Sequence, residues 1–169
     1  RVWALPSKDM GGMRVLVTAG PTREYIDPVR FISNPSSGKM GYAIARACFN
    51  RGAKVDLVSG PVELKPPQGV VVHKVETALQ MYEKVLELYE EADIVFKAAA
   101  VADYRPVEVK EQKIKKLQDS MVLEMVRNPD ILLELGKRKK HQILVGFAAE
   151  TSELEKYAQD KMMRKNLDF

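Results

Sequence analysis

The sequence predicts an α/β, Rossmann-like domain of three layers with a mainly parallel sheet. Short β-branched segments closed by glycine or polar turns alternate along the chain with stretches of helical period. This alternation favours a parallel sheet covered by helices on both faces. The 169 residues fit one domain with one core, and 46% apolar with 30% charged residues is an ordinary globular balance.

The expected strands are short apolar runs. The first, "VLVT", precedes a polar segment, residues 20–35, that we interpret as a long loop. Further strands are expected in "KVDLVSG", "VVVHKV", the start of "DIVFKAAAVADYRP", "MVLEMV" and "QILVGFAAET". In "DIVFKAAAVADYRP", a strand gives way to a small-residue segment that Pro106 is expected to end.

Four helices are expected between these strands. The first runs from Ser36 or Ser37, as the cap, to Gly52. The second covers residues 77–92, the third begins with Asn128 as cap and Pro129 in the first position, and the fourth covers 152–166. The side chains expected to face the core are Met40, Ile44, Ala47 and Cys48 in the first helix, and Leu79, Val85, Leu86 and Tyr89 in the second.

Composition narrows the class of protein. The net charge of +4 mildly favours anionic ligands, and the single cysteine, Cys48, allows no internal disulfide, so a reducing cytoplasm is the expected compartment. No apolar run approaches the roughly 20 residues of a membrane span. Residues 1–13 begin with arginine and end polar and glycine-rich, and we interpret them as a linker or fragment edge.

The stretch "SNPSSGKMG" has a Gly-Lys pair but is not a P-loop. The P-loop pattern needs a glycine where this chain has Ser33, and a serine or threonine where it has Met40. The early glycine permits a nest of backbone N–H groups, and the hydroxyl holds magnesium. What remains is Ser36, Ser37 and Gly38 at a helix N-terminus, which fits an ordinary cap and an anion site equally well.

Two other function classes lack their signatures. A nicotinamide-dependent oxidoreductase needs a three-glycine turn after the first strand and an acid after the second, and "TAGPTREYID" and "KVDLVSG" supply neither. A nucleic-acid-binding protein is disfavoured because the lysines and arginines are scattered, without a basic stripe interleaved with aromatic residues. His73 and His141 belong to no motif, so a zinc site or a histidine triad is unsupported.

Six motifs occur together and in order: "VTAGPTREYIDPVRFISNPSSGKMG", "AAAVADYRP", "KIKK", "NPDIL", "VGFAAET" and "RKNLD". Jointly they resemble the phosphopantothenoylcysteine synthetase family, the ligase domain of a bacterial bifunctional protein of coenzyme A biosynthesis. The resemblance covers residues 14–168, so we expect the ligase domain to occupy 14–169. Family members continue beyond "KNLDF", so the C-terminal part of the domain is expected to be missing.

The resemblance implies a reaction in two steps. CTP activates the carboxylate of 4′-phosphopantothenate as an acyl-cytidylate and releases pyrophosphate, and the amine of L-cysteine then displaces CMP. It also implies Mg²⁺, a homodimer and a decarboxylase domain in the same full-length chain, with no nucleic acid or membrane partner. A non-catalytic nucleotide-binding module of the same fold stays open as the alternative, although it leaves Asn34 without a role.

The resemblance assigns roles to residues that would otherwise have ordinary interpretations. Asn34 is expected to act on the acyl-cytidylate, because an amide donates hydrogen bonds without titrating. Lys113, the first lysine of "KIKK", is expected to act in acyl-cytidylate formation and to bind CTP. Arg30 is expected to contact a phosphate or the neighbouring subunit, and Ala99 and Ala100 to let the substrate approach the backbone.

The remaining implied residues form the CTP site. Asp103 would hold magnesium near the triphosphate. The others are Pro129, Asp130, Ile131 and Leu132 at the cytosine, Phe147, and Lys161 and Lys165 near the phosphates and ribose. From the residues alone, 128–131 are a helix start, Phe147 is a core residue, and the two lysines are a surface pair that shares one helix face.

Overall fold

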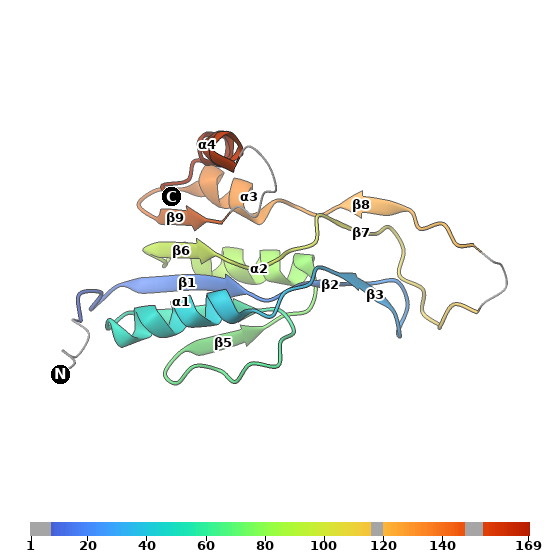
Figure 1. Ribbon diagram of the computed structural model, residues 1–169, viewed down its shortest axis with the longest axis horizontal. Coiled ribbons are helices and arrows are strands. Elements are labelled where there is room, and N and C mark those ends of the chain that lie inside the picture. The colour runs from blue at the N-terminus through green and yellow to red at the C-terminus, as the bar shows by residue number, and fades with distance from the viewer. Residues whose placement is uncertain (1–7, 116–119, 148–153) are drawn as a thin grey trace.

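A five-stranded parallel sheet forms the centre of the molecule (Figure 1). The structure, a computed structural model, describes residues 8–115, 120–147 and 154–169. The strands follow the order β5-β4-β1-β6-β9. Their bounds are β1 Arg14–Ala19, β4 Lys54–Ser59, β5 Val71–Lys74, β6 Ile94–Lys97 and β9 Ile143–Gly146. The predicted α/β fold with a mainly parallel sheet is confirmed.

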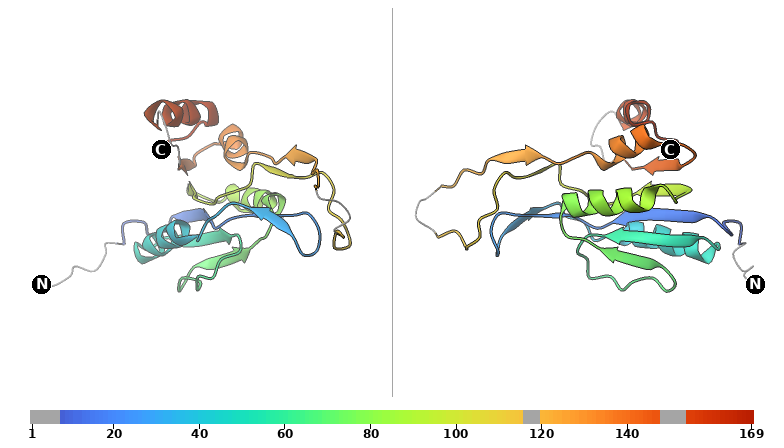
Figure 2. Two further views of the ribbon diagram at one scale, coloured as in Figure 1. Left: turned by 45° about the vertical axis from the view of Figure 1, so that its right-hand side comes forward. Right: turned by 180° about the vertical axis from the view of Figure 1, so that it is seen from behind.

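Helices cover both faces of this sheet. On one face α1 (Lys39–Asn50) packs Tyr42, Ala45 and Cys48 against β1 and β4. On the other face, α2 (Ala78–Tyr89) and α3 (Ile131–Arg138) enclose a second apolar cluster that includes Leu16 and Leu144. Figure 2 shows α2 in front of the sheet when the molecule is seen from behind, whereas α1 lies in front in Figure 1. The three-layer prediction is confirmed.

The last helix, α4 (Leu154–Lys165), packs on α3 outside the sheet. Gly136 of α3 makes this close packing possible, because a Cβ added there would lie 2.0 Å from Lys165 O. Asn166 ends α4 with a positive φ of 54° and donates from Nδ2 to Gly136 O at 3.1 Å. Asp168 then accepts a 2.7 Å bond from Leu144 N of β9, so the chain after α4 is fixed to the sheet edge. No helix among the described residues is long and apolar enough to cross a membrane.

Two small antiparallel pairs extend beyond the carboxyl ends of the central strands (Figure 1). They are β2 (Arg23–Tyr25) with β3 (Phe31–Ser33), and β7 (Tyr104–Pro106) with β8 (Met125–Arg127). The first pair corrects the prediction of one long loop over residues 20–35. Its strands are only three residues long, and cross-strand packing supports them: the Arg23 guanidinium lies 4.6 Å from the Phe31 ring centre.

The second pair corrects two further predictions. The small-residue segment ends before β7, and Pro106 is the last residue of that strand, where it pairs with Met125. Only the last part of the predicted strand "MVLEMV" is a strand, because β8 begins at Met125. In this two-stranded pair, Pro106 needs no N–H for a further neighbour, which is why proline is tolerated there.

Two helix starts differ from the predictions. Neither Ser36 nor Ser37 caps α1, because the N-cap is Gly38, in the left-handed conformation with φ 73°. In α3 the N-cap is Asp130, which accepts from Leu133 N at 3.0 Å, so Pro129 precedes the helix instead of opening it. Asn128 does not cap the helix either, because its side chain donates to Ala102 O. Thr77 does cap α2, through a capping box with Gln80.

The buried faces of α1 and α2 are rotated relative to the predicted ones. Met40, Ala47 and Leu79 are exposed, although each was expected in the core. The predicted Val85, Tyr89 and Cys48 are buried, and Ile44 and Leu86 are partly buried. The sheet-facing surface of α1 contains Gly41, which no hydrophobic pattern reveals because it has no side chain.

Gly41 sets the distance between α1 and β1. A Cβ added there would lie 2.5 Å from Ala19 Cβ and 2.9 Å from Thr18 O. We expect Gly41→Ala to lower the free energy of unfolding by about 1–3 kcal/mol through overpacking, although helix propensity alone favours alanine by about 1 kcal/mol. Urea denaturation measures the change. In the matched variant Ala47→Gly, on the exposed face, propensity alone predicts a loss of about 1 kcal/mol, and a stabilising Gly41→Ala would contradict the packing argument.

Candidate functional site

A cavity of about 520 Å³ lies at the carboxyl end of β6, where the strand order reverses. From β1 the chain proceeds to β4 and β5 on one side, and then to β6 and β9 on the other. In open α/β sheets such a switch point forms a crevice that binds ligands. The cavity is lined by residues 97–103 from the end of β6 onward and 127–132 around the start of α3, and by Met40, Phe147, Lys161 and Lys165.

The floor of the cavity is a backbone segment, residues 98–102, that buried hydroxyls hold in place. Thr18 Oγ1 accepts from Ala99 N at 3.1 Å, and Thr22 Oγ1 accepts from Ala102 N at 3.0 Å. Both threonines have no exposed surface. Because buried polar groups need partners, each threonine and the N–H that it binds satisfy one another. The predicted substrate residues Ala99 and Ala100 therefore belong to a cavity floor whose backbone is fixed.

Two asparagines bind the carbonyl groups of the same segment. Asn34, the predicted catalytic amide, is not itself among the lining residues, but its Nδ2 donates to the backbone oxygen of the lining residue Val101 at 3.2 Å. Asn128 is buried, and its Nδ2 donates to Ala102 O at 2.8 Å while its Oδ1 accepts from Arg105 at 3.0 Å. Asn128 thus fixes the cavity floor to the start of α3, a role that sequence reasoning missed because it assigned this residue to a helix cap.

Asp130 and Lys165 join α3 to α4 at the cavity wall. Lys165 Nζ lies 2.7 Å from Asp130 Oδ2, while Asp130 Oδ1 caps α3. Burial raises the pKa of Asp130, but the hydrogen bonds from Lys165 and from Leu133 N outweigh it, and the pKa lies below its ordinary value. Asp130 is therefore a carboxylate at neutral pH that holds the Lys165 ammonium beside the cavity.

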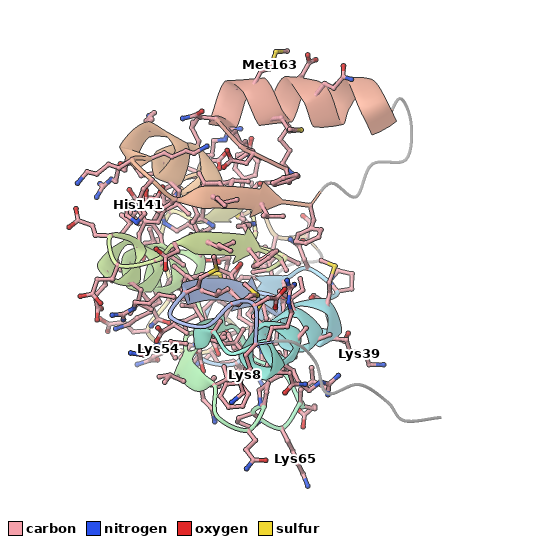
Figure 3. The ribbon with its side chains drawn as sticks, turned by 90° about the vertical axis from the view of Figure 1, so that its left-hand side faces the viewer. Lys8, Lys39, Lys54, Lys65, His141 and Met163 are labelled. Carbon is pink, nitrogen blue, oxygen red and sulfur yellow. The ribbon has the colours of Figure 1, made fainter. Side chains whose placement is uncertain are left out.

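Lys161 is hydrogen-bonded to the residue that follows β9. Its Nζ donates to Phe147 O at 2.7 Å, and Phe147 follows β9 with its ring partly exposed to the cavity. The predicted pair of lysines thus faces the cavity from one side of α4, as their spacing of four residues requires. Met163, between them in sequence, points away from the sheet on the outer face of α4 (Figure 3).

Lys97 and Arg127 also line the cavity, and sequence reasoning missed both. Lys97 ends β6, and its Nζ donates to Ala99 O at 3.1 Å. Burial, together with the charges of Lys161 and Lys165, lowers the pKa of Lys97 to about 8 against the opposite effect of nearby carboxylates. The available signal was a lysine that closes the apolar run "DIVF" directly before the alanines.

Asp103 contributes a carboxylate to the cavity rim, and its backbone oxygen accepts from Asn128 N at 2.8 Å. Within the described part of the chain, histidine, cysteine and acidic side chains form no group of three or more that would hold a metal by themselves. Magnesium commonly binds through one or two carboxylates together with substrate phosphates. A single aspartate beside a cavity with several cations fits that mode of binding.

Arg30 and Lys113 do not line the cavity. Arg30 donates to Asp27 and to Ile114 O, and Ile114 N in turn donates to Asp27 Oδ2 at 3.1 Å. Asp27 is buried, which raises its pKa, but backbone hydrogen bonds from Ile114, Val29 and Arg30 lower it to about 2. This network fixes the segment that carries Lys113 against the β2–β3 turn, so the roles of Arg30 and Lys113 stay predictions.

Ser36, Ser37 and Gly38 lie beside the cavity without lining it, whereas Met40 in the first turn of α1 does line it. A Cβ added to Gly38 would lie 3.4 Å from Gly20 N, and Gly20 O accepts from Ala100 N at 2.9 Å. The start of α1 is therefore one backbone layer from the cavity floor. Its role as a phosphate site stays a prediction.

Comparison with known proteins identifies the family of this chain. Residues 10–169 match the model of the DNA/pantothenate metabolism flavoprotein C-terminal domain family. The chain belongs to this family. It is 54% identical over 164 residues to the coenzyme A biosynthesis bifunctional protein CoaBC of Bacillus subtilis, covering 96% of this chain and 40% of that protein. The corresponding protein of Haemophilus influenzae is 52% identical over 163 residues, with 96% and 41% covered.

A solved structure gives the same result. The crystal structure of the C-terminal domain of a CoaBC protein superimposes with a TM-score of 0.86 at 51% identity, covering 96% of this chain and 77% of that one. The resemblance inferred from the motifs is thereby confirmed. The chain spans about 40% of the length of the curated relatives that it matches.

Thr22 tests how the cavity floor is held. We expect Thr22→Val to lower the free energy of unfolding by about 1–3 kcal/mol, because the buried N–H of Ala102 loses its acceptor without a change in side-chain volume. Thr22→Ser keeps the hydroxyl and serves as the control. Thermal unfolding followed by circular dichroism gives both values. A valine variant as stable as the unmodified protein would show that the hydroxyl does not hold this segment.

Proposed function

We propose that this chain is the CTP-dependent ligase that joins 4′-phosphopantothenate to L-cysteine in coenzyme A biosynthesis. One observation carries the proposal: the predicted CTP-site residues other than Lys113, which come from four separate parts of the sequence, line a single cavity. The relatives at about 50% identity are named for coenzyme A biosynthesis, which supports the pathway. They are bifunctional, which supports a decarboxylase domain in the full-length protein.

The proposed reaction has two bond exchanges. A carboxylate oxygen of 4′-phosphopantothenate attacks the α-phosphorus of CTP, and pyrophosphate leaves with the electron pair of the broken P–O bond. The amine of L-cysteine then attacks the acyl carbon, the C–O bond to CMP breaks, and the amine loses a proton. Both steps move negative charge onto phosphate oxygens, which Lys161, Lys165 and the other cavity cations are placed to stabilise.

Individual residues fit parts of this reaction. Asn34 already donates one N–H to the cavity wall, and its amide has a second N–H and an oxygen for the acyl-cytidylate. Phe147 offers an aromatic face and residues 129–132 offer backbone groups to the cytosine. Asp103 is the residue that would hold Mg²⁺, and the ion would supply charge neutralisation for the leaving pyrophosphate.

The proposal predicts a specific defect for Asn34→Asp. Pyrophosphate release with CTP, magnesium and 4′-phosphopantothenate should continue for about one equivalent, and the steady-state rate with L-cysteine should fall at least about 100-fold. A carboxylate at this position repels the phosphate of the acyl-cytidylate and donates no hydrogen bond. Quenched-flow measurement of pyrophosphate, with ATP as comparator, gives both values.

Asn50→Asp is the matched control, since Asn50 is exposed at the far end of α1. It should leave both phases unchanged. CTP binding without turnover in the unmodified protein would favour the non-catalytic nucleotide-binding module, and no CTP binding at all would contradict the assignment.

We also propose that the chain forms a homodimer through the two antiparallel pairs. Exposed apolar side chains are concentrated there: Val29, Phe31, Ile32, Tyr104, Val107, Val109, Val122 and Val126. Apolar surface of this extent commonly marks a protein interface. Lys113 lies in the connection between β7 and β8. It therefore reaches the cavity described above only if this connection rearranges or a second copy of the chain supplies it.

The dimer proposal is tested with the double variant Val109→Asp and Val122→Asp. Val122 is 94% exposed, so the charge should not affect the fold of one chain, but it should weaken association at least about tenfold. Light scattering after size exclusion gives the mass. Met163→Asp, exposed on the outer face of α4, is the control and should remain dimeric. A monomeric unmodified chain would contradict the proposal.

A further inference from the structure

Among the described lysines that line the cavity, Lys97 is the one to which the family resemblance assigns no role. It ends β6 at the switch point, half-buried, and its side chain reaches into the cavity from the floor. Resting on the proposed function, we propose that the Lys97 ammonium binds a phosphate oxygen of the nucleotide, and that the chain takes up a proton at Lys97 as the nucleotide binds.

The charges around Lys97 come from several of the elements that border the cavity, whereas α1 contributes only the uncharged Met40. Lys161 and Lys165 face it from α4, and Asp130 faces it from the start of α3. Asp103 belongs to the segment after β6, and Arg127 ends β8. Among the described residues, four cations therefore share this cavity with two carboxylates, and this imbalance suits a polyanionic ligand.

Neither of the two carboxylates forms an ion pair with Lys97. Asp130 is bonded to Lys165 at 2.7 Å, and within the described residues no carboxylate lies at ion-pair distance from Lys97 Nζ. An ammonium carries three N–H donors, and the 3.1 Å bond to Ala99 O uses one. The geometry thus leaves a cation on the cavity floor with donors for a ligand oxygen, and the nucleotide phosphates are the anions that the proposed reaction brings there.

Proton uptake follows from the same surroundings. Burial and the two neighbouring lysines place the pKa of Lys97 at about 8, so near pH 8 about half of the free protein carries a neutral amine there. A bound polyanion favours the charged form and raises the pKa. Binding at pH 8 should therefore take up about half a proton, and affinity should fall as the pH rises above 8.

A purely structural role of Lys97 predicts no proton uptake on nucleotide binding. If Lys97 serves only to donate to Ala99 O, a neutral amine does so equally well, and nucleotide binding neither moves a proton nor depends on the charge. The two roles therefore differ in the number of protons taken up on nucleotide binding, which can be measured without turnover.

The experiment is calorimetric titration of the protein with CTP and magnesium at pH 8, in two buffers of different ionisation enthalpy. We expect uptake of about half a proton for the unmodified chain. Lys97→Met should abolish the uptake and weaken binding about tenfold. Lys97→Arg, always charged, should abolish the uptake but keep the affinity within about threefold and independent of pH between 7 and 9.

Lys54→Met is the matched control, because Lys54 is exposed at the opposite, amino end of the sheet (Figure 3). It should leave affinity and proton uptake unchanged. CTP binding without proton uptake, with equal affinity for Lys97→Met, would overturn the role of Lys97 and leave the proposed ligase intact. Absence of CTP binding by the unmodified, folded protein would overturn both. Circular dichroism verifies the fold of each variant, and Lys97→Arg keeps the test decisive if Lys97→Met is unfolded.

Discussion

The two buried hydroxyls at the end of β1 and just beyond it are the constraint on which the site depends. Thr18 and Thr22 accept the N–H groups of Ala99 and Ala102, so the segment after β6 leaves the sheet along a fixed path. Three side chains then bind the carbonyl groups of this segment: Lys97, Asn34 and Asn128. Because their acceptors belong to a single fixed backbone, residues from three distant parts of the chain are held in register at one switch point.

The outer wall of the cavity depends on a second close contact. Gly136 lets α4 approach α3 so closely that the Lys165 backbone lies against it, and Asp130 pairs with the Lys165 side chain from the same direction. The lysines of α4 are therefore positioned by packing as well as by charge. A displacement of α4 would move both Lys161 and Lys165, whereas Lys97 would stay with the sheet. The positions of Lys161 and Lys165 thus depend on the contact between α3 and α4, whereas the position of Lys97 depends on the sheet.

Much of this arrangement follows from the sequence, because period and turn chemistry identify buried strands and amphipathic helices. The sheet and its two helical layers were predicted in this way, whereas β2 and β3 were missed because "REY" and "FIS" have no apolar alternation. The face of α1 was misplaced because Gly41 contributes no hydrophobic signal. Within the site, the resemblance supplied Asp103, Phe147 and the two lysines of α4. Thr18 and Thr22 were missed, since a threonine in or after a strand looks like an ordinary β-former.

The position of Lys97 shows why the electrostatics of the cavity were the hardest part to predict. A lysine at the end of a strand is usually solvated, and only the tertiary structure reveals that α4 brings two more ammonium groups to the same space. Grouping like charges is unfavourable in the free chain, and Asp130 offsets it chiefly at Lys165. The N-terminus of α3 adds a partial positive charge at the same wall. The clustered ammonium groups and the helix N-terminus become favourable when a polyanion enters, so the surplus of positive charge is part of the binding energy for a phosphorylated ligand, and Lys97 contributes to it from the cavity floor.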